Sequence, residues 1–307
     1  MFKTDLCQFP TPDNLLLPGL LFTPSKPTKK VAIFLHGCGS SSVFYSVKRA
    51  HALAKAFCSQ GIALLMFNNR GAHLIKKLSK VDETGEEVED ILLGTSYELI
   101  KDSQHDIVGA INFLHNHNYQ QLYLIGHSTG ANKICVYNHY QPQNSIEKYI
   151  LLGAGDDTGM LYNLIGNHQK FLKFLKQAQD RISQGKGRKF VPKYMRSWLI
   201  SYQSFYDMAN PDGDYNCFPY AQHLSKIKLS KKPLFRYFKA IGKPTLVIYG
   251  QSDQYAPDNS GQKAIKTLEA QVQDRPNFQF ELIAKADHSF HKKEDELGRI
   301  MASWLLQ

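Results

Sequence analysis

The stretch LYLIGHSTGAN, residues 122–132, runs an apolar segment directly into a turn in which Ser128 stands between Gly126 and Gly130. The apolar residues are typical of a buried strand, and the residues at 131–140 that follow the turn are typical of a helix. So short a turn strains the backbone at the serine, and side chains at the two glycine positions would collide with the adjoining strand and helix. The segment therefore predicts a strand–turn–helix unit that presents Ser128 at a sheet edge.

Short apolar runs alternate with helix-like stretches along most of the chain. Because parallel strands need crossover connections, this alternation predicts an α/β fold with a mostly parallel, twisted sheet flanked by helices. Ser103 is expected to be the N-cap of the helix that begins there. The predicted strands span 31–37, 62–69, 121–127, 148–155, 245–253 and 278–288, and the predicted helices span 46–60, 103–117, 131–140, 260–274 and 293–306.

Two segments interrupt this alternation. Residues 70–102 are polar and carry a run of acidic side chains, and residues 156–242 combine helical spacing with many aromatic residues but no buried β-run. We therefore expect 156–242 to form a helical cap over one edge of the sheet. The core would then consist of residues 1–155 and 243–307.

The net charge of +10 is concentrated in the cap. Residues 166–243 contain 16 lysines and arginines against 4 acidic residues, so the remainder of the chain is slightly acidic. Such a patch could attract an anionic substrate, an acidic lipid surface or RNA, and solvated helix faces explain it equally well. No nucleic-acid-binding motif accompanies the charge, so we expect no nucleic-acid partner.

Cysteine usage and the first residues bear on the compartment. The five cysteines are an odd number without paired spacing, which does not indicate a disulfide framework. The first residues, MFKTDLCQFPTPDN, contain no apolar leader, and no run approaches the ~18 apolar residues of a membrane-spanning helix. A cytoplasmic location is therefore expected.

Ser128 needs a base, because a serine hydroxyl is a poor nucleophile at neutral pH. The segment FELIAKADHSF places His288 after a late predicted strand, and TLVIYGQSDQYAP places Asp253 at the end of another. The carboxyl ends of parallel strands share one edge, where open α/β sheets bind their ligands. The chain order Ser128, Asp253, His288 thus predicts a triad in which the imidazole takes the serine's proton and the aspartate orients the imidazole.

Other carboxylates compete with Asp253 for the third position. Asp287 adjoins His288 but would point away from it, and Asp258 lies past the strand end in a loop. Asp214 and Asp207 lie in the predicted cap. No His, Cys or Asp spacing in the sequence indicates a metal site.

An ester or amide substrate also needs amide donors for the oxyanion of its tetrahedral intermediate. His36 and Gly37 follow the first long apolar strand and would let the backbone approach the serine turn. The expected donors are the backbone N–H groups of Cys38 and Thr129, the second at a helix N-terminus where negative charge is favoured. Cys38 itself could instead be a redox or nucleophilic thiol.

Five short motifs together resemble the α/β-hydrolase superfamily: HG at 36–37, FNNRG at 67–71, GHSTG at 126–130, GQSD at 250–253 and DHSF at 287–290. The resemblance covers residues 31–155 and 243–305. It implies the fold, a cap domain and a Ser-His-Asp mechanism carried by Ser128, His288 and Asp253. It says nothing about specificity.

These observations predict a cofactor-free serine hydrolase, most simply a carboxylic-ester hydrolase that forms an acyl-Ser128 intermediate. Its substrate would be a small ester, and the basic cap points to an anionic one or to weak contact with an acidic membrane. An amidase or peptidase of the same fold, a non-catalytic protein that retains the pocket, and a lyase remain alternatives. Aromatic residues of the cap would line an acyl or aryl pocket or pack the cap on the core: Trp198, Tyr202, Phe205 and Tyr206.

Overall fold

The structure, a computed structural model, describes residues 1–196 and 198–307. Its central sheet has eight strands in the order β1-β2-β4-β3-β7-β8-β9-β10. The pairs β1–β2 and β2–β4 are antiparallel, and all the others are parallel. The strands are β1 (Phe2–Pro10), β2 (Leu16–Pro24), β3 (Lys30–Leu35), β4 (Ala63–Phe67), β7 (Gln121–His127), β8 (Ile146–Leu152), β9 (Thr245–Gly250) and β10 (Phe278–Ile283).

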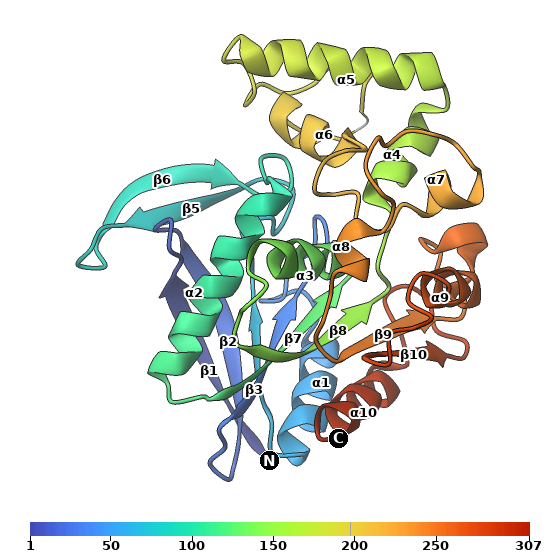
Figure 1. Ribbon diagram of the computed structural model, residues 1–307. Helices are drawn as coiled ribbons and strands as arrows, with labels where there is room; N and C mark the ends of the chain where they lie inside the picture. Colours follow the sequence, from blue (N-terminus) through green and yellow to red (C-terminus); the bar gives the residue numbers. More distant parts are fainter. Residues whose placement is uncertain (197) are drawn as a thin grey trace.

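Helices cover both faces of this sheet (Figure 1). Val31 and Ile33 of β3 belong to one buried apolar cluster and Ala32 and Phe34 to the other, as the two-residue period of a strand buried on both faces requires. The first cluster includes buried residues of α2 (Ser103–Asn116), α3 (Thr129–Tyr140) and α9 (Gly261–Glu269). The second contains α1 (Val47–Ser59) and α10 (Glu294–Leu305).

The predicted α/β architecture, with its parallel strands and flanking helices, is confirmed. The antiparallel strands β1 and β2 were not predicted. Ser103 is not the N-cap of α2, because Asp102 occupies that position and the Ser103 hydroxyl donates a hydrogen bond to the Ile100 carbonyl at 2.6 Å.

The two interrupting segments have structures of their own (Figure 1). Within residues 70–102, β5 (Lys76–Val81) and β6 (Glu87–Leu93) form a separate antiparallel hairpin. Residues 156–242 contribute helices, of which α4 to α7 lie above the carboxyl ends of the central strands. These helices are α4 (Asp157–Ile165), α5 (His168–Ser183), α6 (Tyr202–Ala209), α7 (Tyr220–Leu224) and α8 (Arg236–Lys239).

No helix of the described residues is both long enough and apolar enough to cross a lipid bilayer.

Candidate functional site

Ser128 occupies the turn between β7 and α3 in a backbone conformation that L-residues rarely adopt, with φ 57° and ψ −129°. Its amide donates a hydrogen bond of 2.8 Å to the Leu152 carbonyl at the end of β8. A side chain at Gly126 would collide with the backbone of Gly130, and one at Gly130 with the Leu35 carbonyl. The turn is therefore held tightly between three parallel strands, with the half-buried serine at their carboxyl ends.

His288 and Asp253 form a hydrogen-bonded pair beside this turn. The imidazole Nδ1 lies 2.9 Å from Asp253 Oδ1 and 3.0 Å from Oδ2, so Nδ1 carries the proton that it donates to the carboxylate. Both side chains are buried, and the Tyr255 amide also donates to Asp253 Oδ1 at 2.9 Å. This arrangement leaves Nε2 of His288 unprotonated in the neutral ring, which is the form that a general base needs.

Two contacts bring the pair to the serine turn. His127, the residue before Ser128, donates from Nε2 to the His288 carbonyl at 2.8 Å. A Cβ on Gly153, which follows β8, would lie 3.0 Å from Asp253 Oδ2 and 3.1 Å from His288 Nδ1. Within the described residues the Ser128 hydroxyl makes no hydrogen bond to the imidazole.

The competing carboxylates have partners elsewhere. Asp287 accepts from His291 at 2.8 Å, and Asp258 pairs with Lys263. Asp207 accepts from the Ile100 amide, and Asp214 accepts from the hydroxyls of Tyr140 and Tyr237. Only Asp253 of these five contacts His288.

The loop after β3 lies directly against the serine. A Cβ on Gly37 would lie 2.7 Å from Ser128 Cβ, so only glycine permits this approach. His36 is buried, its Nδ1 donates to the Gly37 carbonyl at 2.9 Å and its Nε2 accepts from the Asn69 amide at 3.2 Å. Burial lowers the pKa of His36 to about 3, so it supports this loop as a neutral ring.

The amide groups expected to bind an oxyanion adjoin this contact. In the described part of the chain, neither the Cys38 nor the Thr129 amide donates a hydrogen bond to another group. Thr95 holds the loop from outside, because its hydroxyl accepts from the Gly39 amide at 2.7 Å and donates to the Gly71 carbonyl at 2.9 Å. Burial raises the pKa of the Cys38 thiol to about 12, which disfavours the thiolate that a redox or nucleophilic cysteine requires.

Buried polar groups that the sequence did not reveal lie beneath the serine helix. Lys133 of α3 pairs with Glu98 and donates to Asn69 Oδ1 at 3.0 Å, and both charged side chains are almost fully buried. Asp157 accepts from the Thr129 hydroxyl at 3.0 Å, and burial raises its pKa to about 6. The Asn69 contact ties the FNNRG turn to α3, so this network fixes the serine helix relative to the neighbouring loops.

Replacing Lys133 with methionine is expected to lower the free energy of unfolding by about 3–5 kcal/mol, because it leaves the Glu98 carboxylate buried without a counter-charge. Thermal unfolding followed by circular dichroism measures the effect. The double variant Lys133→Met/Glu98→Gln should recover at least half of the loss, and Lys77→Met, which breaks an exposed ion pair with Asp90, should leave Tm unchanged. A double variant as unstable as the single one contradicts the charge argument.

The aromatic residues predicted to line a pocket occupy two kinds of environment. Tyr202 and Phe205 of α6 are buried within the main apolar cluster. Trp198 and Tyr206 are partly buried against the same cluster. Packing accounts for the first two, and a role in substrate binding stays a prediction for all four. Arg196, which was not predicted as a site residue, is buried beside Trp198 with its guanidinium over the indole ring.

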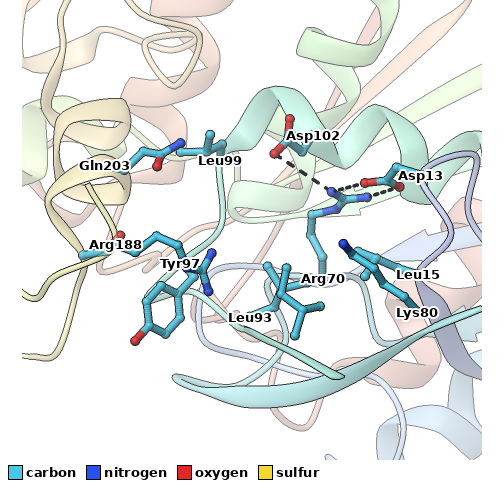
Figure 2. A pocket seen from close by; sticks show the side chains of 12 residues that line it. Asp13, Leu15, Arg70, Lys80, Leu93, Tyr97, Leu99, Asp102, Arg188 and Gln203 are labelled. Carbon is cyan, nitrogen blue, oxygen red and sulfur yellow. Dashed lines mark hydrogen bonds and ion pairs between the residues drawn. The ribbon is translucent and has the colours of Figure 1, made fainter. Parts of the chain in front are cut away.

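A cavity of about 290 Å³ lies apart from these groups (Figure 2). Residues from the β5–β6 hairpin, the FNNRG turn and segment 156–242 line it, and Ser128 and His288 do not. Arg70 points from its wall toward Asp13, which accepts two hydrogen bonds of 2.9 Å, and it also pairs with the buried Asp106 at 2.8 Å. These carboxylates raise the pKa of Arg70 further and occupy its donors, so Arg70 offers little to a ligand. Among the described residues, no group of three or more His, Cys, Asp or Glu side chains could hold a metal ion.

Sequence comparison gives a family match but no curated relative. A family model described as "Protein of unknown function (DUF1749)" matches residues 93–305. No curated protein sequence matches the chain.

Solved structures resemble the whole chain at low sequence identity. The Pyrococcus furiosus esterase Pf2001 has a TM-score of 0.56 and 15% identity over 99% of this chain and 91% of its own. Ferulic acid-bound Est1E from Butyrivibrio proteoclasticus has a TM-score of 0.59 and 14% identity over 98% of each chain. Dienelactone hydrolase from Anabaena variabilis has a TM-score of 0.53 and 15% identity over 99% of this chain and 97% of its own. The chain therefore has the α/β-hydrolase fold, as its motifs predicted.

Proposed function

The chain belongs to the DUF1749 family and has the α/β-hydrolase fold, and from the geometry at Ser128 we propose that it is a serine hydrolase acting on carboxylic esters. The observation that carries the proposal is the buried His288–Asp253 pair, which is hydrogen-bonded to His127, the residue before the strained Ser128. A strained serine, a neutral imidazole oriented by a carboxylate and free amides around one point are the parts that acyl transfer requires.

In the proposed reaction, His288 Nε2 takes the proton from Ser128 Oγ as the oxygen attacks the ester carbonyl carbon. The Cys38 and Thr129 amides stabilise the oxyanion, and Asp253 stabilises the imidazolium. The bond from carbon to the alcohol oxygen then breaks, and His288 returns the proton to the departing alcohol. Water, deprotonated by the same nitrogen, attacks the acyl-Ser128, and release of the carboxylic acid restores the serine.

The missing hydrogen bond between Ser128 and His288 calls for a rotation of one side chain. The serine has one rotatable bond, and such contacts often tighten only when substrate is bound. Ser128 is half-buried, so its side chain is not fully enclosed by the protein.

Ester turnover tests the proposal directly. We expect the purified protein to hydrolyse p-nitrophenyl butyrate, and p-nitrobutyranilide at least about 10²-fold more slowly, because an amine leaves less readily than a phenolate and needs a proton from the histidine. Release of p-nitrophenol or p-nitroaniline is followed by absorbance. Faster turnover of the anilide would make the protein an amidase, and no turnover of a panel of esters of graded acyl length would oppose the proposal.

A further inference from the structure

Arg196 carries a buried positive charge that forms no ion pair and no side-chain hydrogen bond in the described part of the protein. The residue is 3% exposed, and its Nε, Nη1 and Nη2 atoms are all buried without a hydrogen-bond partner. Trp198 lies under the guanidinium, and its own Nε1 is also buried without an acceptor. Four donor nitrogens on these two side chains therefore lack an acceptor among the described residues.

Proteins rarely bury an unpaired charge, because moving a charge out of water costs free energy that only a partner offsets. The indole face attracts the cation from one side but accepts no N–H···O hydrogen bond from its edge. The nearby carboxylate of Asp157 accepts from Thr129 and Asn132 instead. The unmet donors point to an acceptor that arrives with a ligand.

Hydrogen bonds connect the segment after Arg196 to residues that support the candidate active site. Leu199 and Ser201, which come later in the chain, are hydrogen-bonded to Ser96. The Ser96 hydroxyl donates to the Leu199 carbonyl at 2.6 Å, and the Ser96 carbonyl accepts from the Ser201 amide at 2.8 Å. The neighbouring Thr95 holds the Gly39 amide. The arginine loop is thus attached to the segment that supports the loop after β3, against which Ser128 packs.

Burial lowers the pKa of Arg196 to about 10, and the negative charge of the Asp157 carboxylate acts in the opposite direction. Asp157 itself accepts from the hydroxyl of Thr129, the residue after Ser128. The guanidinium remains charged at neutral pH, so an anionic acceptor suits it better than a neutral one.

We propose that Arg196 and Trp198 bind an ionised carboxylate of the substrate, so that the preferred ester carries a second, anionic end. The inference rests on the proposed hydrolase function and names its substrate class. A planar guanidinium edge matches a carboxylate through two parallel hydrogen bonds, and the indole N–H can add a third. The concentration of positive charge in the cap would favour the approach of such a substrate.

Matched substrates test this. Wild type, Arg196→Met and Lys193→Met are compared on p-nitrophenyl hemiglutarate and p-nitrophenyl valerate, and on 4-acetoxybenzoate and phenyl acetate. These pairs put the carboxylate on the acyl or the alcohol side. In at least one pair, Arg196→Met is expected to lower the ratio of kcat/KM for the charged over the neutral ester about 10- to 100-fold.

Controls separate the local interaction from the overall charge. Lys193 is exposed three residues earlier in the same loop, so Lys193→Met removes one cap charge and should leave the ratio unchanged. A far-ultraviolet circular dichroism spectrum of Arg196→Met equal to that of wild type shows that the variant is folded. Arg196→Lys retains the charge without the planar fork and should give an intermediate ratio.

Binding without turnover provides a second readout. Calorimetry with p-nitrophenyl hemiglutarate on Ser128→Ala should show binding that weakens about 10- to 100-fold in Ser128→Ala/Arg196→Met. Equal ratios in all variants, with binding unaffected by Arg196, would overturn the carboxylate site while leaving the hydrolase in place. Absence of turnover with every ester opposes the hydrolase, and the calorimetry then still decides whether Arg196 binds the carboxylate.

Discussion

Ser128→Ala is expected to lower kcat for p-nitrophenyl butyrate by at least about 10⁴-fold, because the acyl-enzyme route requires the Ser128 oxygen. Water cannot easily replace this oxygen, since the loop at Gly37 packs against the serine side chain. Binding should change little, because the amides of Cys38 and Thr129 remain. Steady-state kinetics with a stopped assay for slow turnover measures the loss.

The matched control is Ser252→Ala, which removes an exposed hydroxyl from the residue before Asp253. This variant should retain wild-type kcat. The far-ultraviolet circular dichroism and Tm of Ser128→Ala should equal or exceed those of wild type, because alanine keeps the Cβ and removes only a hydroxyl. A Ser128→Ala protein that keeps more than a tenth of wild-type kcat contradicts nucleophilic catalysis by this serine.

Asp253→Asn is expected to lower kcat about 10²- to 10⁴-fold with little change in KM. Asp253 accepts from His288 Nδ1 with both oxygens within 3.0 Å, and this interaction fixes the tautomer that leaves Nε2 free. An asparagine can offer its NH₂ group to the imidazole and favour the other tautomer, and it cannot stabilise the imidazolium. Kinetics at pH 7 to 8 reports the change.

Asp287→Asn is the control for this variant. Asp287 is adjacent to His288 in sequence, but its carboxylate accepts from the exposed His291. We expect a kcat within about twofold of wild type, since surface substitutions of this kind have small effects. If Asp287→Asn loses more activity than Asp253→Asn, the acid of the triad has been misassigned.

Local sequence patterns predicted the elements that carry the site. The apolar runs of β3, β4, β7, β8 and β9 are recognisable because strands buried on both faces are nearly continuous in hydrophobic residues. The strand β1 has exposed residues and pairs along a single edge with β2, so its apolar content is weak and it escaped prediction. Strands β5 and β6 are more polar still, and the register of each depends on its pairing with the other.

The site divides in the same way. Ser128, His288 and Asp253 were predictable because motifs mark the turns that follow strands. The support around them depends on contacts between residues far apart in the chain: Lys133 with Glu98, Thr129 with Asp157, and Thr95 with Gly39. A buried lysine on an amphipathic helix has the same local pattern as an exposed one. The environment of Arg196 likewise depends on how its loop is fastened to Ser96.

The division into a core and a cap of residues 156–242 stays a prediction, as do the cytoplasmic location and weak contact with acidic lipid. The arrangement of α4 to α7 above the carboxyl ends of the central strands agrees with a cap (Figure 1).

Covalent labelling tests the central claim most directly. A fluorophosphonate probe reacts with a serine only when a base and oxyanion donors activate it. We predict one adduct per chain, located by peptide mass spectrometry on Ser128, absent from Ser128→Ala and strongly reduced in Asp253→Asn. A folded wild-type protein that stays unlabelled, or one labelled at a residue other than 128, would contradict the account.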